Sequence, residues 1–199
     1  MSTETVQLFC GLLTLLAAAA TVTVIGLRIA ASAGSEGAAR LGASVTDAGA
    51  WLAFLVAATA TVGSLYFSES AHFTPCRLCW FQRIAMYPLA VILLVGAIRR
   101  DRGVRWYVAP IATIGALISA YHTLIEWRPS LDTGACEMTG PSCTYVWFRE
   151  FGFLSLATMA LIGFLTILTL VLVRFPARLS DDADAAGQVA PSSGTERTA

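Results

Sequence analysis

Charged residues are scarce in this chain, and lysine is absent from all of its 199 positions. Asp, Glu, Lys and Arg make up 13 % of the residues, about half their share in an average soluble domain. The formal net charge is zero, so the chain lacks the basic excess that binds nucleic acid. Hydrophobic residues make up 56 %, more than a soluble globule of this size can bury. This composition excludes a soluble enzyme and a DNA-binding protein, and it predicts a protein embedded in membrane lipid.

Five stretches are long and apolar enough to cross a bilayer, which takes about 20 residues of helix. One of them, Cys79–Ile98, contains a charged residue, Arg83, near its start. Backbone groups find no water in lipid, so each stretch is expected to be helical. The sequence therefore predicts an all-α, integral membrane helical bundle with five spans. These are Thr5–Leu27, Ala48–Ser68, Cys79–Ile98, Trp106–Ile125 and Phe151–Val173.

The arginines indicate which loops face the cytoplasm, because short cytoplasmic loops are enriched in Lys and Arg. The connection Arg99–Arg105 holds four arginines in seven residues. Placing it inside puts Glu69–Leu78, Glu126–Glu150 and the N-terminus outside. The leader Met1–Thr5 has no basic residue, so the first stretch is expected to be a span rather than a secretory signal. We predict a multi-pass protein of the plasma or inner membrane whose C-terminus is cytoplasmic.

The composition divides the chain into three parts. Residues 1–47 are expected to hold one membrane helix and a small, Gly- and Ala-rich cytoplasmic linker, Ala30–Thr46. Residues 48–173 hold the other four spans as a compact unit. Residues 174–199 are rich in Asp, Gly, Ser and Thr beyond Ser180 and are expected to form a disordered cytoplasmic tail.

The positions of the five cysteines point to the chemistry. Cys10 lies within the first span and is interpreted as a small packing residue. Cys76 and Cys79 form a Cys-x-x-Cys pair where the third span begins, and Cys136 and Cys143 lie in the loop before the last span. All four loop cysteines fall on the predicted outer side, which is where disulfides persist.

Three interpretations of these cysteines compete. Redox exchange between the pairs is favoured, because thiols at this spacing are typical of disulfide oxidoreductases. Two structural disulfides are the simpler alternative, since the turn at Gly140-Pro141 would let Cys136 and Cys143 close. A zinc site is disfavoured because zinc ribbons repeat the tight Cys-x-x-Cys spacing and the second pair does not. No metal is expected.

The surroundings of Cys79 strengthen the redox interpretation. Cys79 begins a helix, where free amides and the helix dipole stabilise an anion, and Arg83 follows four residues later on the same face. A thiolate, the reactive form, is therefore expected at Cys79. Trp80, Phe81 and Tyr87 can line a slot for a flat, lipid-soluble electron acceptor. No flavin or nucleotide motif is present, so a membrane quinone is the expected acceptor.

One segment carries a specific family resemblance. Residues 75–89, Pro-Cys-Arg-Leu-Cys-Trp-Phe-Gln-Arg-Ile-Ala-Met-Tyr-Pro-Leu, resemble the signature of the DsbB family of disulfide bond formation proteins, and are most similar to its BdbC-like branch. Tyr121–Leu124 resembles a second family segment, and a cysteine pair in the last outer loop completes the pattern. The resemblance covers Ala48–Val173 and implies a four-helix redox unit, to which this chain adds one N-terminal helix.

The resemblance also implies roles for the four loop thiols. The family passes electrons from a DsbA-like, thioredoxin-fold partner to quinone, the relay that keeps a bacterial periplasm oxidising. Cys136 and Cys143 would accept electrons from the partner, with Cys136 attacked first. Cys143 would then exchange with Cys76, and Cys79 would face the quinone.

The same resemblance assigns the quinone site. Arg83 would polarise a quinone oxygen and His122 would lie near the ring, and the quinone would be ubiquinone or menaquinone. The chain departs from the family pattern at Gln82, where some relatives carry Glu, and at Glu126, where a neutral amide is common. Both departures concern the charge near the acceptor and leave every thiol in place.

Two other functions remain open from the sequence. A vitamin K epoxide reductase-like enzyme would share the outer Cys-x-x-Cys and the loop cysteines, although the run Cys79–Arg83 fits that family less well. A membrane scaffold with two structural disulfides would not be an enzyme at all. Cycling of the cysteine pairs with added quinone would separate an enzyme from a scaffold.

Overall fold

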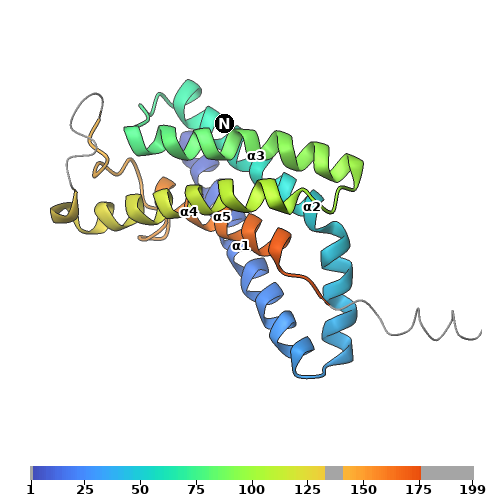
Figure 1. Cartoon of the computed structure of the whole chain (residues 1–199). Helices are drawn as coiled ribbons and strands as arrows, with labels where there is room; N and C mark the ends of the chain where they lie inside the picture. The colour runs from blue at the N-terminus through green and yellow to red at the C-terminus, as the bar shows by residue number, and fades with distance from the viewer. Residues whose placement is uncertain (1, 133–140, 176–199) are drawn as a thin grey trace, which may run out of the picture.

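The computed structural model describes residues 2–132 and 141–175. Apart from an isolated bridge between Glu150 and Leu154, these residues form helices and the turns between them (Figure 1). A π-helical turn, η1, continues the second helix, and a short 3₁₀ helix, η2, follows the fourth. The elements are α1 (Thr3–Ser32), α2 (Glu36–Leu65), η1 (Tyr66–Ser70), α3 (Arg77–Arg99), α4 (Arg105–Trp127), η2 (Pro129–Leu131) and α5 (Leu156–Leu172).

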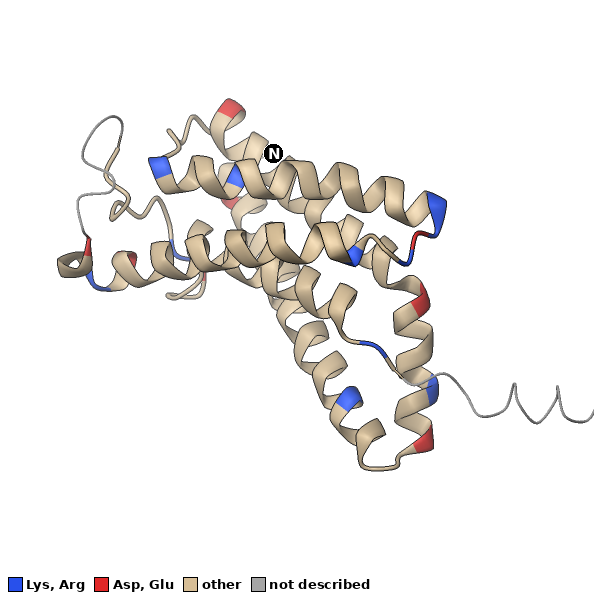
Figure 2. Ribbon diagram, in the orientation of Figure 1, with Lys and Arg blue, Asp and Glu red and all other residues tan. Residues whose placement is uncertain are grey.

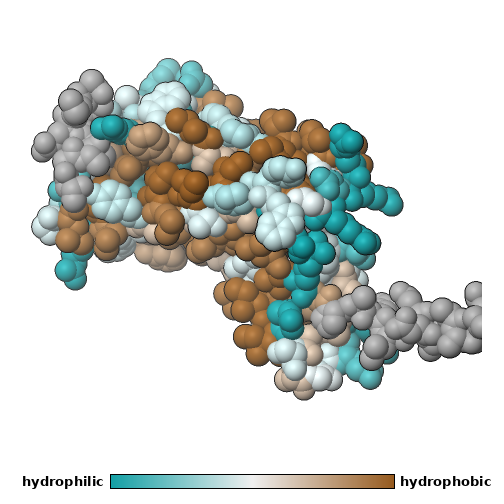
Figure 3. Space-filling model, in the orientation of Figure 1, coloured by the Kyte–Doolittle hydropathy of each residue, from teal (hydrophilic) through white to brown (hydrophobic). Residues whose placement is uncertain are grey.

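The predicted all-α membrane fold is confirmed. Within the described residues, α1, α2 with η1, α3 and α4 are long and apolar enough to cross a membrane. The charged residues of α3 and α4 lie toward the ends of these two helices, and the middle of each helix carries none (Figure 2). Much of the visible face is apolar (Figure 3), and exposed side chains such as Leu16, Val22 and Leu117 suit contact with lipid.

The last helix is shorter than its predicted span. The sequence suggested Phe151–Val173, whereas α5 covers Leu156–Leu172, which is 17 residues. Phe151 and Gly152 adopt positive φ angles of 53° and 80°, and this turn delays the start of the helix. Ser155 then caps α5 by accepting a hydrogen bond from the amide of Thr158, as serine does at many helix starts.

The expected linker Ala30–Thr46 is a helical hairpin instead. Residues on both sides of a turn at Ala33–Ser35 belong to α1 and α2, and the hairpin extends away from the other helices (Figure 1). Alanine is the best helix former, so the composition that suggested a linker also favours helix. Gly34, with φ at 94°, makes the turn that reverses the chain.

The core lies between α2, α3, α4 and α5. Its fully buried side chains include Leu89 and Leu93 of α3 and Phe164 of α5. Gly115 of α4 allows Phe164 to pack closely, because an added Cβ there would come within 2.4 Å of the ring. These four helices form the predicted four-helix unit.

The additional helix α1 packs against α2 and α5 and is held there by a polar contact. The hydroxyl of Thr21 donates a hydrogen bond of 2.9 Å to the hydroxyl of Thr166 on α5. The chain therefore has one helix beyond the four-helix unit, as predicted, and that helix belongs to the bundle rather than standing apart from it.

Candidate active site

The Cys-x-x-Cys pair lies at the N-terminus of α3. Cys76 is the residue that caps the helix, and its Sγ accepts a hydrogen bond of 3.2 Å from the backbone amide of Cys79. The Sγ atoms of Cys76 and Cys79 are 2.6 Å apart, and both thiols are free. The two sulfurs are thus close enough to form a disulfide with small movements of the side chains alone.

The contacts that stabilise an anion converge on Cys76. A hydrogen bond between the sulfurs of Cys79 and Cys76 and the nearby His122 lower the pKa of the Cys76 thiol to about 4, against the opposing effect of burial. The sequence placed the thiolate at Cys79, which begins the helix. The structure corrects that prediction, because the sulfur at the capping position, Cys76 Sγ, is the one that accepts the helix amide.

His122 of α4 connects the thiol pair to the last loop. Its Nε2 donates a hydrogen bond of 3.1 Å to the carbonyl oxygen of Cys143 and lies 3.7 Å from Cys76 Sγ. Its Nδ1 accepts a hydrogen bond of 3.2 Å from the amide nitrogen of Gln82. His122 is 3 % exposed, so these three contacts fix the ring within the protein.

Glu126 lies one helical turn beyond His122. One of its carboxylate oxygens is 3.8 Å from His122 Nε2, and the other accepts a hydrogen bond of 2.5 Å from the hydroxyl of Ser155. Sequence reasoning identified Glu126 as a departure from the family pattern but missed Ser155. The signal for Ser155 was a serine directly before the apolar run of the last helix, which is typical of a helix cap.

Cys143 lies beside the thiol pair. It is fully buried in one cluster with Cys76, Leu78 and Ile125, and it is disulfide-bonded. The structure therefore brings Cys76, Cys79 and Cys143 together, an arrangement that the family resemblance implied. Cys136 lies outside the described residues. The remaining cysteine, Cys10, is a free thiol on α1.

Stacked aromatic rings hold the last loop against the start of α3. Phe73 stacks on Trp147 of that loop with ring centroids 4.6 Å apart and planes 8° apart. Phe67 of η1 also stacks on Phe73, with the two ring centroids 5.7 Å apart. Aromatic contacts of this kind stabilise beyond the area they bury, so they keep Cys143 near the thiol pair.

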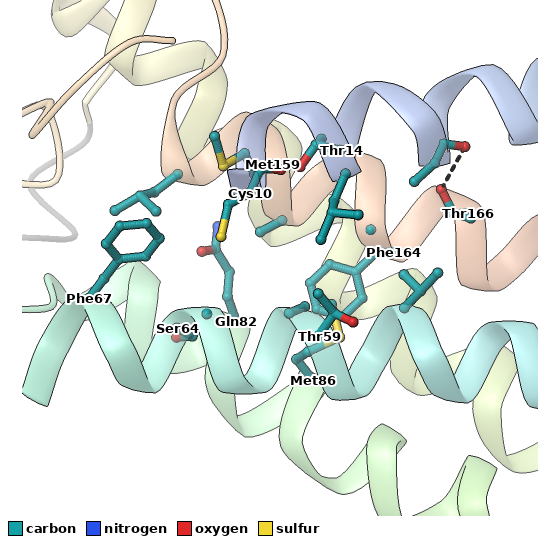
Figure 4. A pocket seen from close by; sticks show the side chains of 18 of the residues that line it. Cys10, Thr14, Thr59, Ser64, Phe67, Gln82, Met86, Met159, Phe164 and Thr166 are labelled. Atoms are coloured by element: carbon teal, nitrogen blue, oxygen red, sulfur yellow. Dashed lines mark hydrogen bonds between the residues drawn. The ribbon is translucent and has the colours of Figure 1, made fainter. Parts of the chain in front are cut away.

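A cavity of about 510 Å³ opens beside Cys79. Gln82, Arg83 and Tyr87 of α3 contribute to its lining, and much of the rest is apolar (Figure 4). His122 lines a smaller neighbouring pocket with Cys76 and Cys79. The cavity is thus next to Cys79, while His122 faces the thiols and the last loop.

Arg83 is anchored by a residue that the sequence did not single out. Its Nε and Nη2 atoms donate hydrogen bonds to the hydroxyl and the carbonyl oxygen of Ser64 on α2, at 3.0 and 2.9 Å. Its guanidinium carbon lies 5.3 Å from the centroid of the Trp80 ring. These contacts hold the cation at the edge of the cavity with part of the guanidinium left for a ligand.

The thiol pair also offers a set of metal ligands. Among the described residues, the sulfurs of Cys76 and Cys79 and a ring nitrogen of His122 lie within 4.8 Å of one another. Two thiolates and an imidazole are ligands that zinc accepts. The same three groups suit thiol chemistry, in which a histidine lies beside a reactive sulfur.

Comparisons with known proteins agree with this arrangement. Residues 46–174 match the family model described as Disulfide bond formation protein DsbB. The chain is 42 % identical over 118 residues to Disulfide bond formation protein C of Bacillus subtilis, a match that covers 59 % of this chain and 86 % of that protein. It is 41 % identical over 122 residues to Probable disulfide formation protein C 2 of Bacillus anthracis, covering 61 % and 86 %.

A further relative comes from another genus. Probable disulfide formation protein of Deinococcus radiodurans is 48 % identical over 102 residues, which is 51 % of this chain and 67 % of that protein. No solved structure matches the chain. The family match begins at residue 46, so all of α1 and the first part of α2 lie outside it.

Proposed function

We propose that this chain, which belongs to the DsbB family of disulfide bond formation proteins, re-oxidises a thioredoxin-fold, DsbA-like protein and passes the electrons to a membrane quinone. The family and the apolar helices establish a multi-pass membrane protein with a role in disulfide bond formation. The partner, the quinone and the outward orientation of the redox end belong to the proposal. One observation carries it: a free Cys76–Cys79 thiol pair packs against the disulfide-bonded Cys143 at the edge of a cavity.

The thiol contacts support a direction for the exchange. In the oxidised enzyme, the Cys143 thiolate attacks Sγ of Cys76 in a Cys76–Cys79 disulfide, which forms a Cys143–Cys76 bond and releases Cys79. The Cys136 thiolate then attacks Cys143, closes the Cys136–Cys143 disulfide and releases the Cys76 thiolate. Two electrons and two protons have then moved to the Cys76–Cys79 pair. A free Cys76–Cys79 pair beside a bonded Cys143 is the state that follows this transfer.

The low pKa of Cys76 suits its part in the second step. Thiol–disulfide exchange is faster when the leaving thiol has a low pKa, and the pKa of Cys76 is about 4. His122 donates toward the same sulfur and holds the backbone of Cys143, so it keeps the two reacting residues adjacent. A reduced DsbA-like partner would reopen the Cys136–Cys143 disulfide.

The cavity beside Cys79 fits a quinone. A flat ring with two carbonyl oxygens needs an apolar space with a few donors, and Arg83 and Gln82 supply donors within a largely apolar lining. When bound, a quinone supplies a two-electron, two-proton acceptor for the dithiol. Arg83 would hold a carbonyl oxygen, and Ser64 would keep the guanidinium in place.

The free thiols at Cys76 and Cys79 disagree with the scaffold alternative, which needs both pairs as permanent bridges. The decisive experiment measures oxidation of a reduced DsbA-like protein by the purified chain with decylubiquinone, and separately with menadione. We expect quinone-dependent turnover that is lost in Cys76→Ser and Cys79→Ser. Val91→Ser, at a residue of α3 that is 62 % exposed and does not line the cavity, is the control and should retain turnover. Full activity of either active-site variant, or none in the unmodified protein with both quinones, would refute the proposal.

A further inference from the structure

The cavity beside Cys79 extends well beyond the thiol pair, and one of its walls is helix α1. Six residues of α1 line it, from one end of the cavity to the other: Cys10, Leu13, Thr14, Leu16, Ala17 and Ala20. None of these six lies in the part of the chain that the family model matches, residues 46–174. The additional helix therefore completes a space that the four-helix unit alone would leave open on one side.

We propose that α1, with the facing sides of α2 and α5, forms a binding site for the hydrocarbon tail of the quinone, and that Ala17 sets the room available to that tail. The inference rests on the proposed function, because the tail belongs to the acceptor whose ring lies near Cys79. It assigns a task to the one span that the family unit lacks.

The lining changes character along the cavity. Close to the thiols it includes Gln82 and Arg83, whereas farther along it includes Leu52, Leu55 and Leu170. Two of the threonine hydroxyls in the lining, those of Thr14 and Thr166, are already bonded. Thr14 donates to the carbonyl oxygen of Cys10 at 2.8 Å.

Thr166, on the opposite wall, behaves in the same way. It donates to the carbonyl oxygen of Ile162 at 2.8 Å and accepts a hydrogen bond from Thr21. With their hydroxyls engaged, these threonines present little that a polar ligand could bond. The far region therefore suits a hydrocarbon chain attached to a polar ring at the other end.

The dimensions also fit a tail. Cys10 and Ala20 are ten residues apart on one helix, which corresponds to about 15 Å at the α-helical rise. That length exceeds a single aromatic ring and leaves room for a chain of several carbons. The volume of about 510 Å³ falls within the range of roughly 300–1,000 Å³ of pockets that enclose small ligands.

Small side chains keep this space open on three helices. Ala17 and Ala20 lie on α1, Ala60 and Gly63 on α2, and Gly163 on α5. A Cβ added to Gly63 would lie 3.5 Å from Cys10 Sγ, so α1 and α2 approach each other closely beside Ser64. A larger residue at Ala17 would fill the space without touching the thiol pair.

The test compares quinones that share a ring and differ in their tail. The probes are decylubiquinone and the tailless ubiquinone-0, assayed with reduced DsbA-like protein and the full-length chain. Ala17→Phe should raise KM for decylubiquinone by on the order of tenfold or more, because burial of several methylenes is lost. KM for ubiquinone-0 should change less than twofold. Val22→Phe is the matched control, because Val22 lies on the same helix and is 70 % exposed.

A second variant removes wall surface instead of adding it. Leu13→Ala should raise KM for decylubiquinone about threefold, as expected when one side chain loses contact with an apolar ligand, and again spare ubiquinone-0. Equal effects on both quinones, or no effect of either variant, would overturn the inference and leave membrane lipid as the occupant of the far region. Activity of the unmodified protein with ubiquinone-0 would meanwhile keep the proposed function intact, so the two failures are distinguishable.

Discussion

His122 Nε2 donates a hydrogen bond of 3.1 Å to the carbonyl oxygen of Cys143, and this bond connects α4 to the loop that carries Cys143. The same nitrogen lies 3.7 Å from Cys76 Sγ. A single imidazole thus positions two cysteines that are distant in sequence. Its placement explains why a histidine at the end of a membrane helix is buried among polar contacts rather than exposed to lipid headgroups.

Replacement of His122 should slow exchange between the two cysteine pairs. His122→Gln loses the ring contact with Cys76 Sγ and disturbs the bond to Cys143, so turnover with the DsbA-like partner should fall about tenfold, as for loss of one hydrogen bond to a charged group. The chain has two histidines, and exposed His72 provides the control His72→Gln. Equal turnover of both variants would show that His122 has no positioning role.

The reactivity of Cys76 should depend weakly on pH across the neutral range. The pKa of Cys76 is lowered to about 4 by its hydrogen bonds with Cys79 and His122, so the reduced protein already holds the thiolate at pH 6. Alkylation of Cys76 by iodoacetamide, followed by peptide mass spectrometry, should give a rate that levels off above about pH 5. In His122→Gln the inflection should move to higher pH. An inflection near pH 8.5, the value of an unperturbed thiol, would contradict this assignment.

The same lowered pKa links stability to pH. Because the folded protein favours the thiolate more than the unfolded chain does, Cys76 contributes its full stabilisation above the unfolded pKa, near 8.5. This contribution declines as pH falls and is lost once pH passes below the folded value of about 4. Thermal unfolding of the reduced protein and of Cys76→Ser should therefore differ more near pH 8 than at lower pH, and converge near pH 4.

Replacement of Arg83 should weaken binding of the quinone and leave formation of the Cys76–Cys79 disulfide unchanged. Arg83→Ala removes a guanidinium that is held at the cavity by Ser64, so KM for decylubiquinone should rise about tenfold, the cost of one charge-assisted hydrogen bond. Formation of the Cys76–Cys79 disulfide by a chemical oxidant should be unchanged. Exposed Arg77, on the same helix, gives the control Arg77→Ala. Unchanged quinone kinetics in Arg83→Ala would leave this residue as a lipid anchor.

The sequence predicted the helices, and the closeness of Cys76 to Cys79, because both depend on local patterns. A run of about 20 apolar residues forms a helix in lipid whatever surrounds it, and Cys76 and Cys79 are neighbours by virtue of their spacing. The linker prediction for Ala30–Thr46 failed because small residues favour both flexible and helical backbone, and Ser35 and Gly34 decide where the turn falls.

The contacts that define the site could not be predicted from the sequence, because they join segments that are distant along the chain. Ser64 meets Arg83 across two helices, and no spacing pattern relates them. The choice of Cys76 over Cys79 as the thiolate depends on which sulfur accepts the helix amide, a matter of backbone geometry. The approach of Cys143 to Cys76 requires the last loop to fold back, which the family resemblance implied and the residues alone did not.

The helices α1 and α2, which form the hairpin, are longer than the hydrocarbon layer of a membrane is thick. Each of these helices has 30 residues, about 45 Å of helix, whereas the hydrocarbon layer is about 30 Å thick. Directly after the turn, α2 carries Glu36 and Arg40, which pair at 3.7 Å and need water. Either both helices are steeply tilted from the membrane normal, or the helical hairpin extends beyond the bilayer on the same side as the Arg99–Arg105 connection. In the second case, a reporter inserted at Gly34 would lie outside the lipid, at the opposite end of the molecule from Cys76 and Cys79.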